Sequence, residues 1–172
     1  GTTALTIKDS SAAPPSSTAP VTFKPNTSTR PLIQGSVNTK GIFDIFTTNW
    51  IIFDGSNTNN GTSRDLTIQN TGSAGCNTIW IGSSRRDSSS NFITLKNCNL
   101  INGSTAYINV VVASVVKGSS SPNPGWFSNI TFQNDSIATG YTGIWASGDS
   151  ASQNVSNGSN LTVDSCVITN LK

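Results

Sequence analysis

The sequence predicts an all-β chain folded as a parallel β-helix, also called a β-solenoid, and two observations lead to this prediction. First, a short segment recurs with conservative changes at residues 65–70, 92–97, 129–134 and 160–165. Each copy alternates apolar and polar residues and then closes on Asn or Ser, which is typical of a half-buried strand followed by a turn. Second, the copies are separated by 27, 37 and 31 residues. A strand that recurs at such intervals indicates a solenoid with insertions in its turns.

Stacking the four copies predicts which side chains form the core and which form the turn. Neighbouring strands of a sheet lie about 4.8 Å apart, so equivalent residues stack in columns. Two inward columns are expected: Leu66, Ile93, Ile130 and Leu161 in one, and Ile68, Leu95, Phe132 and Val163 in the other. At the turn, Asn tolerates a left-handed backbone and its amide can bond the next amide. We therefore expect an Asn ladder that consists of Asn70, Asn97 and Asn134.

Three further apolar segments, residues 78–83, 109–114 and 143–148, are expected to form a second sheet. If their isoleucines face inward, an apolar stripe faces outward, and it consists of Trp80, Val111 and Trp145. Such a stripe is a candidate surface for stacking a sugar ring or for a lateral contact with another protein. The opposite phase, or a loop over the stripe, would bury the tryptophans. Continuous apolar runs do not distinguish these alternatives.

The repeated pattern of Asn, apolar, Thr, apolar, variable residue and Asn, with its expected Asn ladder, resembles the right-handed parallel β-helix of the pectin-lyase-like superfamily. Residues 50–55 and 64–70 are similar to repeats in large secreted bacterial surface proteins. The resemblance covers roughly residues 40–172 and implies a right-handed parallel β-helix there. It implies no single activity, because that fold serves lyases, hydrolases, phage tailspikes, adhesins and inert stalks.

The chain of 172 residues is long enough for one domain with a sizeable core. We expect the β-helix domain to span residues 21–172, and residues 1–20 to contain a strand followed by a linker rich in Pro and Ser. The strand, which includes Leu5 and Ile7, either folds back as a cap of the solenoid or pairs with a neighbouring molecule.

Two parts of the expected β-helix domain are less regular. Short strands are expected within residues 21–55, but only 15 residues separate Ile51 from Leu66, too few for a full turn of three sheets. The pattern therefore does not assign the strands within residues 21–55 to a particular sheet or turn of the solenoid. Segments rich in Ser, Gly and Asn are expected to bulge from the turns, at residues 84–91, 115–128 and 148–159.

Composition and charge exclude several classes of partner. Asn, Ser and Thr make up 69 of the 172 residues, whereas charged residues make up only 10%. The formal net charge of +2 creates no strong field, and the only basic dipeptide is Arg85–Arg86, so no nucleic-acid partner is expected. No apolar run approaches the ~18 residues of a membrane span, so no span is expected. We expect a processed piece of a secreted product, extracellular or at the cell surface.

The residues needed for catalysis are sparse. The pectin-cleaving enzymes that the resemblance suggests need clustered carboxylates with a His or a basic residue, because an acid and a base must converge on one bond. The chain contains eight Asp but neither Glu nor His, and no two acidic residues are adjacent. Asp54, Asp135 and Asp164 fall in different columns of the expected stacking, where they serve as strand-end or turn acceptors. We therefore predict no catalytic residue, no cofactor and no metal site.

The three cysteines are expected to be free, buried thiols. Cys98 and Cys166 occupy equivalent places two strands apart, which separates them by about 9.6 Å. A disulfide needs Cα atoms within about 7 Å of each other. Cys76 and Cys98 are the remaining plausible disulfide pair, because they lie on adjacent rungs, but the alignment offsets Cys76 from Cys98 by five positions.

The expected function is that of a structural or adhesive module, a repeating unit of an extracellular filament or stalk. A solenoid ends in unpaired strands, so head-to-tail stacking or strand exchange between copies is expected to cover them. The residues expected to take part are Leu5, Ile7, Leu161, Val163 and Val167. One alternative is a carbohydrate-binding or carbohydrate-active β-helix, with a polysaccharide as partner and the tryptophans as sugar platforms. Another is a fragment of a phage tailspike.

Overall fold

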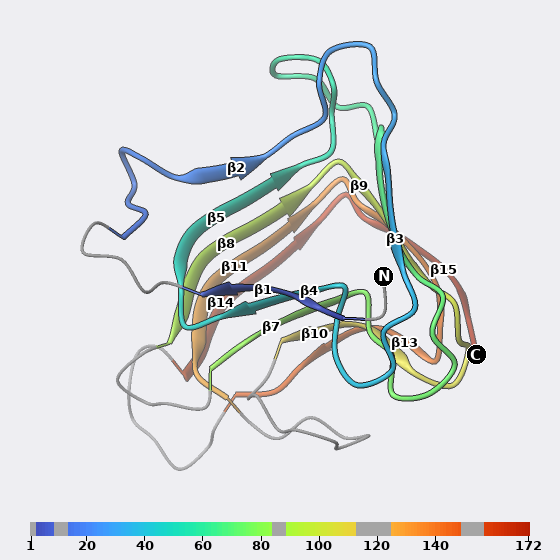
Figure 1. The fold of residues 1–172 in the computed structure, drawn as a ribbon. Coiled ribbons are helices and arrows are strands. Elements are labelled where there is room, and N and C mark those ends of the chain that lie inside the picture. The colour runs from blue at the N-terminus through green and yellow to red at the C-terminus, as the bar shows by residue number, and fades with distance from the viewer. Residues whose placement is uncertain (1–2, 9–13, 84–88, 113–124, 149–156) are drawn as a thin grey trace.

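The computed structural model describes residues 3–8, 14–83, 89–112, 125–148 and 157–172. In these residues, the chain forms fifteen strands, arranged in three parallel sheets of five strands each (Figure 1). The prediction of an all-β parallel solenoid is therefore confirmed. None of the described elements is a helix that is long and apolar enough to cross a membrane.

The chain visits the three sheets in rotation, and we call one strand from each sheet, taken in sequence, a rung. Sheet 1 contains β1 (Leu5–Lys8), β4 (Phe43–Phe46), β7 (Ile79–Gly82), β10 (Ile108–Val112) and β13 (Thr142–Ala146). Sheet 2 contains β2 (Val21–Phe23), β5 (Asn49–Asp54), β8 (Ser90–Lys96), β11 (Phe127–Gln133) and β14 (Asn157–Asp164). Sheet 3 contains β3 (Leu32–Gly35), β6 (Leu66–Asn70), β9 (Cys98–Asn102), β12 (Ser136–Gly140) and β15 (Val167–Leu171).

The core consists of apolar columns that run from the first rung to the last. Sheet 2 contributes two columns: Val21, Ile51, Ile93, Ile130 and Leu161, and Phe23, Phe53, Leu95, Phe132 and Val163. Sheet 3 contributes one: Ile33, Ile68, Leu100, Ile137 and Ile168. Members in the middle rungs are fully buried. Because each fully buried Leu, Ile or Phe contributes about 1.5–3 kcal/mol, these columns dominate the stability.

One of the four repeated segments lies in a different sheet from the one predicted. The segments that contain Ile93, Ile130 and Leu161 stack in sheet 2 as predicted, but Leu66 pairs with Cys98 in sheet 3. Ile51 takes the place that was expected for Leu66. The prediction failed because strands of both sheets alternate in the same way and end in Asn, so the pattern occurs twice in one rung. The 15 residues between Ile51 and Leu66 connect two strands of the same rung.

The corner between sheets 2 and 3 is made by residues with a left-handed backbone. Asn97, Asn134 and Ser165 have φ angles of 58°, 51° and 54°, a conformation that Asn adopts more readily than most residues. Asn134 Nδ2 donates a hydrogen bond to Asn97 Oδ1 at 2.7 Å, so these two amides form a ladder. Asn70 is not part of it. Asn70 lies at the end of β6, where its Nδ2 donates to the carbonyls of Val37 and Asn77.

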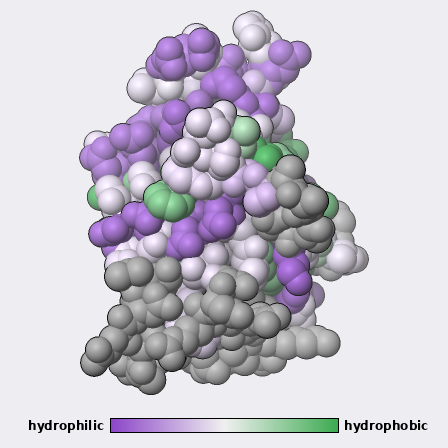
Figure 2. All heavy atoms as spheres, turned by 90° about the vertical axis from the view of Figure 1, so that its left-hand side faces the viewer, coloured by the Kyte–Doolittle hydropathy of each residue, from purple (hydrophilic) through white to green (hydrophobic). Residues whose placement is uncertain are grey.

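The strands of sheet 2 also bend at a column of left-handed residues: Trp50, Phe92, Asn129 and Asn160. The rings of Trp50 and Phe92 stack face to face, with centroids 4.0 Å apart. Asn160 Nδ2 donates to Asn129 Oδ1 at 3.0 Å. Figure 2 views this side of the molecule, where most of the coloured side chains are hydrophilic and the apolar ones are isolated.

Sheet 1 contains the second set of strands that the sequence predicted, and Val111 pairs with both Trp80 and Trp145. The isoleucines of these strands face the core. Trp80, Val111 and Trp145 therefore face outward, which is the first of the two alternatives that the sequence left open. However, Trp80 is only 3% exposed, because it packs with Val111 and Phe46 on the outer face, whereas Trp145 is 40% exposed. The stripe is therefore open to solvent only at Trp145.

The N-terminal strand folds back onto its own chain. In β1, Leu5 pairs with Phe43 of β4 and Ile7 pairs with Ile45, which makes β1 the first strand of sheet 1. Part of the expected linker, residues 9–13, lies outside the described residues. So do Arg85–Arg86 and most of the expected bulges, at residues 84–88, 113–124 and 149–156.

Candidate functional site

An inserted loop, residues 55–65, lies over the corner between sheets 2 and 3 and reaches later rungs. In the next rung, the same corner is turned by the single residue Asn97. Asn97 Nδ2 donates to the carbonyl of Gly61 at 3.2 Å, and Asn134 Nδ2 donates to the carbonyl of Thr62 at 2.8 Å. Arg64 returns two bonds to Asn134, to its backbone carbonyl at 2.6 Å and to its Oδ1 at 2.9 Å. The loop therefore connects the second rung to the third and fourth.

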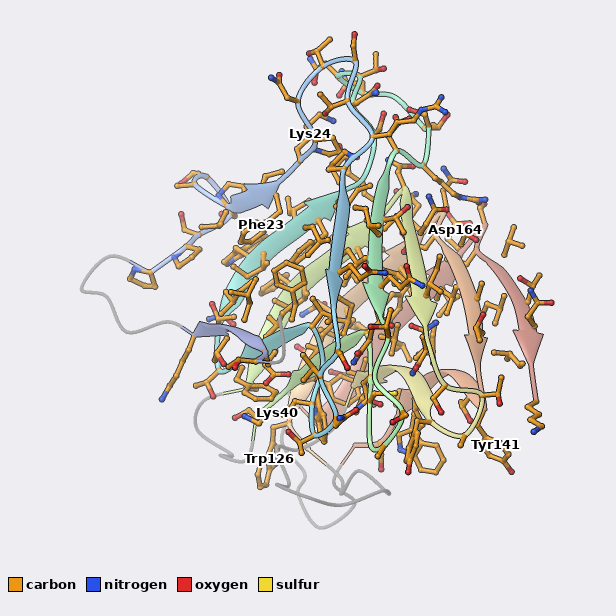
Figure 3. All side chains as sticks on the ribbon, turned by 45° about the vertical axis from the view of Figure 1, so that its right-hand side comes forward. Phe23, Lys24, Lys40, Trp126, Tyr141 and Asp164 are labelled. Carbon is orange, nitrogen blue, oxygen red and sulfur yellow. The ribbon has the colours of Figure 1, made fainter. Side chains whose placement is uncertain are left out.

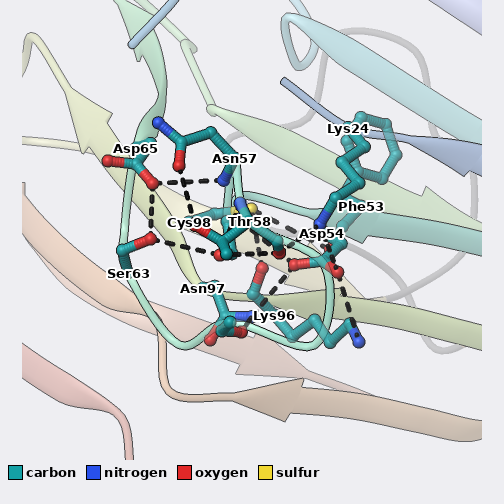
Figure 4. A network of polar contacts seen from close by, with 12 residues as sticks. Lys24, Phe53, Asp54, Asn57, Thr58, Ser63, Asp65, Lys96, Asn97 and Cys98 are labelled. Atoms are coloured by element: carbon teal, nitrogen blue, oxygen red, sulfur yellow. Dashed lines mark hydrogen bonds and ion pairs between the residues drawn. The ribbon is translucent and has the colours of Figure 1, made fainter. Parts of the chain in front are cut away.

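Asp54 holds the start of this loop in a network of polar contacts (Figure 4). Its Oδ1 accepts hydrogen bonds from the Ser56 amide and from Asn97 Nδ2, and its Oδ2 forms ion pairs with Lys24 at 3.1 Å and Lys96 at 3.4 Å. Burial disfavours the charged carboxylate and acts to raise its pKa. The hydrogen bonds from Asn97, Ser56 and Lys24 together outweigh burial, so the pKa of Asp54 is lowered.

Asp65 holds the end of the loop in the same way. Its Oδ2 accepts from Ser63 Oγ at 2.5 Å and from the Asn57 amide at 3.1 Å, and its Oδ1 lies 3.2 Å from Arg30 Nε. The bond from Ser63 is the largest of the effects that lower the pKa of Asp65. Both ends of the loop are thus fixed by ionised carboxylates.

Gly55 is required where the chain leaves β5 to enter the loop. A Cβ at this position would lie 2.0 Å from the carbonyl oxygen of Asn97, an approach that no side chain can make. The absence of a side chain lets the loop pass directly against the corner of the next rung.

A polar groove of about 560 Å³ lies between the loop and the corners of the later rungs. Its lining consists of Asn60, Gly61, Thr62, Lys96, Asn97, Gln133, Asn134, Asp164 and Ser165. Amides, hydroxyls and one charge of each sign face this space, a set of groups that can donate to and accept from a polyhydroxylated molecule. The sequence did not predict the groove, because it depends on a loop that folds back across rungs.

One side of the groove is an outward column of sheet 2, which we call the charged column. It consists of Lys24, Asp54, Lys96, Gln133 and Asp164. The expectation that Asp54 and Asp164 fall in different columns is wrong, because the first repeat was assigned to the wrong sheet. The two carboxylates are nevertheless separated by Lys96 and Gln133, so they do not converge on a common substrate atom. Gln133 Nε2 donates to Asp164 Oδ2 at 3.2 Å.

Asp135 is a buried carboxylate, whereas the sequence predicted an acceptor at a strand end or turn. It faces the core at the corner, level with Cys98 in the rung before and Cys166 in the rung after. Its Oδ1 accepts from the Cys98 amide at 2.8 Å, and its Oδ2 has no hydrogen-bond partner among the described residues. Burial raises its pKa to about 7, against the weaker opposing effects of the Cys98 bond and of Arg64. The equivalence of Cys98 and Cys166 in the sequence was the signal that could have placed Asp135 inside.

The three thiols are free, as predicted, but only Cys76 and Cys98 are buried, and Cys166 is partly exposed. Burial raises the pKa of all three thiols, which lowers their reactivity. Within the described ranges, no three side chains of Cys and Asp lie close enough together to hold a metal ion.

The residues that the sequence singled out lie at separate places. Trp145, the exposed member of the outward stripe, lies on sheet 1 and does not line the groove. Leu5 and Ile7 lie in the first rung, and Leu161, Val163 and Val167 lie in the last. All of these end residues are exposed except Ile7, which is half-buried.

The chain matches no protein-family model, no curated protein and no solved structure. Its fold is therefore established by its own strand pairing. The resemblance to the pectin-lyase-like superfamily rests on the repeated sequence pattern alone.

Proposed function

We propose that this chain is a structural module of an extracellular surface protein, a rod-like segment of a stalk or filament in the manner of pectin-lyase-like β-helices. The observation that carries the proposal is the continuity of its core. The inner columns that contain Ile51, Phe53 and Ile68 are apolar from the first rung to the last, and their end members Val21, Leu161 and Val163 are exposed. Leu5, the first member of an apolar column of sheet 1, is exposed as well. A solenoid of this kind is lengthened by adding rungs that continue the same columns.

Contacts that cross several rungs support a mechanical role, because they hold neighbouring rungs together under tension along the solenoid. The loop of residues 55–65 binds the corners of two later rungs, and Asp54 forms ion pairs with lysines in the rungs on either side of it. Such contacts resist separation of one rung from the next. They supplement the backbone ladders, which alone connect the strands of a simple solenoid.

The described carboxylates also favour a role without catalysis. Asp54 and Asp65 are engaged by cations and by loop amides, and Asp135 is enclosed in the core. A general acid and a general base must both reach the reacting bond. Of the two charged groups that line the groove, Lys96 forms an ion pair with Asp54 and Asp164 accepts a hydrogen bond from Gln133, so both are occupied by structural contacts.

A covalent tandem of two copies, joined so that β1 of the second follows β15 of the first, tests the rod proposal. We expect one cooperative thermal transition above that of the single copy, and a maximum dimension by small-angle X-ray scattering that is close to twice that of one copy. Two independent transitions at the temperature of the single copy would contradict the proposal. Release of uronate from pectin by the single copy would contradict the non-catalytic part.

The polar groove favours a second candidate function, the binding of a polysaccharide. A glycan array identifies any ligand, and titration calorimetry of the variants Gln133→Ala and Trp145→Ala then locates it. Binding that is lost in Gln133→Ala and kept in Trp145→Ala places the sugar in the groove. The reverse result places it on the outward stripe, and no binding to any glycan would remove this candidate.

A further inference from the structure

We propose that a second copy of this chain stacks head to tail on the first, with β1, β2 and β3 of one copy added to β13, β14 and β15 of the other. The inference rests on the proposed structural role and names its partner and its register. Each of these six strands lies at the end of its sheet and pairs on one side only within the described residues.

The inner columns match across such a joint. The last rung ends its columns with Leu161, Val163 and Ile168, and the first rung begins the same columns with Val21, Phe23 and Ile33. Stacking would place Leu161 against Val21, Val163 against Phe23 and Ile168 against Ile33. These contacts repeat the kind that already fills the core, and they remove exposed apolar side chains from water.

Strand direction decides between head-to-tail and symmetric arrangements. All pairs in the three sheets are parallel, and a copy added by translation along the solenoid continues parallel pairing in all three sheets at once. A two-fold dimer would instead place like ends together and reverse the strand direction at the joint. The head-to-tail contact does not close on itself, so it produces a filament.

The charged column gives the joint a complementary pair of charges. From the first rung to the last, the column reads Lys24, Asp54, Lys96, Gln133 and Asp164. It therefore begins with a cation and ends with an anion, and Figure 3 labels Lys24, which directly follows β2, and Asp164, the last residue of β14. A stacked copy would place its Lys24 beside Asp164, as Lys24 already lies 3.1 Å from Asp54 within one chain. A slip of one residue would lose this pair and turn the apolar columns outward.

An outward column of sheet 3 supports the same register. Its middle members are polar, namely Thr67, Asn99 and Ser136. Its two ends are apolar: Leu32 in the first rung is 54% exposed, and Val167 in the last rung is 45% exposed. Apolar side chains at outward positions are thus confined, in this column, to the two places that a head-to-tail joint brings together.

Sedimentation velocity and negative-stain electron microscopy across a concentration series test the joint. We expect the intact chain to form linear filaments, and Asp164→Lys to weaken association by roughly tenfold because two cations then face each other. Asp164→Asn, which removes the anion without adding a cation, should weaken association less than Asp164→Lys does, and it leaves the ion pair of Lys24 with Asp54 intact. Thr131→Lys, an added charge on the same sheet but away from both ends, is the control and should assemble like the parent.

Each result separates this inference from the proposed function. Circular dichroism melts establish that the variants are folded, and Asp164 is exposed in the last rung, so its replacement should leave the core intact. A monomer at every concentration would overturn the inference, while a tandem that melts as one unit would still uphold the structural role. Asp164→Lys filaments as strong as those of the parent would overturn the register. A closed dimer or trimer would overturn the open arrangement, and a trimer would favour a tailspike fragment.

Discussion

Replacing Asp135 with Asn tests the buried carboxylate between Cys98 and Cys166. Asn has nearly the shape of Asp, so its Oδ1 can keep the hydrogen bond from the Cys98 amide. Its Nδ2 takes the place of an oxygen that has no hydrogen-bond partner among the described residues. The variant therefore removes one buried titratable group with little change in packing.

The size of the effect follows from the pKa of Asp135, which burial raises from 3.8 to about 7. In the unfolded chain the carboxyl regains its ordinary pKa, so between these two values the folded state keeps a proton that the unfolded state has released. Stability therefore falls as the pH rises through this window. A difference of roughly three pH units, at about 1.4 kcal/mol for each, gives a loss on the order of 4 kcal/mol.

Urea unfolding of the parent and of Asp135→Asn at a series of pH values measures this loss. We expect the two proteins to be similarly stable at about pH 4, and the variant to be more stable by on the order of 4 kcal/mol at about pH 8. Asp44, whose pKa burial also raises, affects both proteins and cancels in the difference. Equal slopes for the parent and the variant between these pH values would refute the reasoning.

Asp65→Asn provides a control of opposite sign. The hydrogen bond from Ser63 is the main cause that lowers the pKa of Asp65 in the folded chain. The ionised Asp65 carboxylate therefore stabilises the folded chain at pH values above the ordinary pKa of Asp, and this stabilisation is lost as the pH falls below that pKa. The variant should differ from the parent mainly above about pH 4, where it should be the less stable of the two.

Three further predictions concern the core, the corner and the outer face. Leu95→Asp places an unpaired charge in the core and should abolish the cooperative thermal transition. Thr94→Ser should change stability by less than about 1 kcal/mol. If Leu95→Asp melted like the parent, the column of Leu95 would face outward. Gly55→Ala should cost about 3 kcal/mol or more in urea unfolding, because its Cβ would overlap a backbone carbonyl of the next rung, and a neutral result would show that the corner can relax. In a background with Trp50→Phe and Trp126→Phe, iodide should quench the fluorescence of Trp145 and leave Trp80 protected. Adding Trp145→Phe leaves Trp80 as the only tryptophan, and strong residual quenching in that variant would contradict the burial of Trp80.

The sequence allowed the fold and most of one sheet to be predicted, because its local pattern reports which side of a strand is buried. Ile93, Ile130 and Leu161 share a column as their spacing required. The pattern does not report which sheet a strand joins, since strands on both sides of the corner alternate in the same way. That is why Leu66 was assigned to the wrong neighbours, and Asn70 with it.

The candidate site was largely missed, for a different physical reason. The groove exists because Arg64 and Asn134, separated by 70 residues, bind each other across rungs. No periodic pattern encodes such a contact. The burial of Trp80 likewise depends on Phe46 of the neighbouring strand, which packs over the outer face. The continuous apolar run around Trp80 left open both the direction of its side chain and what lies over it.

The loop of residues 55–65 also imposes an order on folding. Its bonds to Asn134 can form only after the fourth rung is in place, although the loop itself precedes the third. A chain that emerges from its amino end during synthesis therefore forms the strands of two further rungs before the contact becomes available. Once formed, the contact joins the loop of the second rung to the corner of the fourth. Unravelling from the carboxyl end then stops at the fourth rung until the bonds to Asn134 break, so these bonds protect the second, third and fourth rungs against stepwise loss.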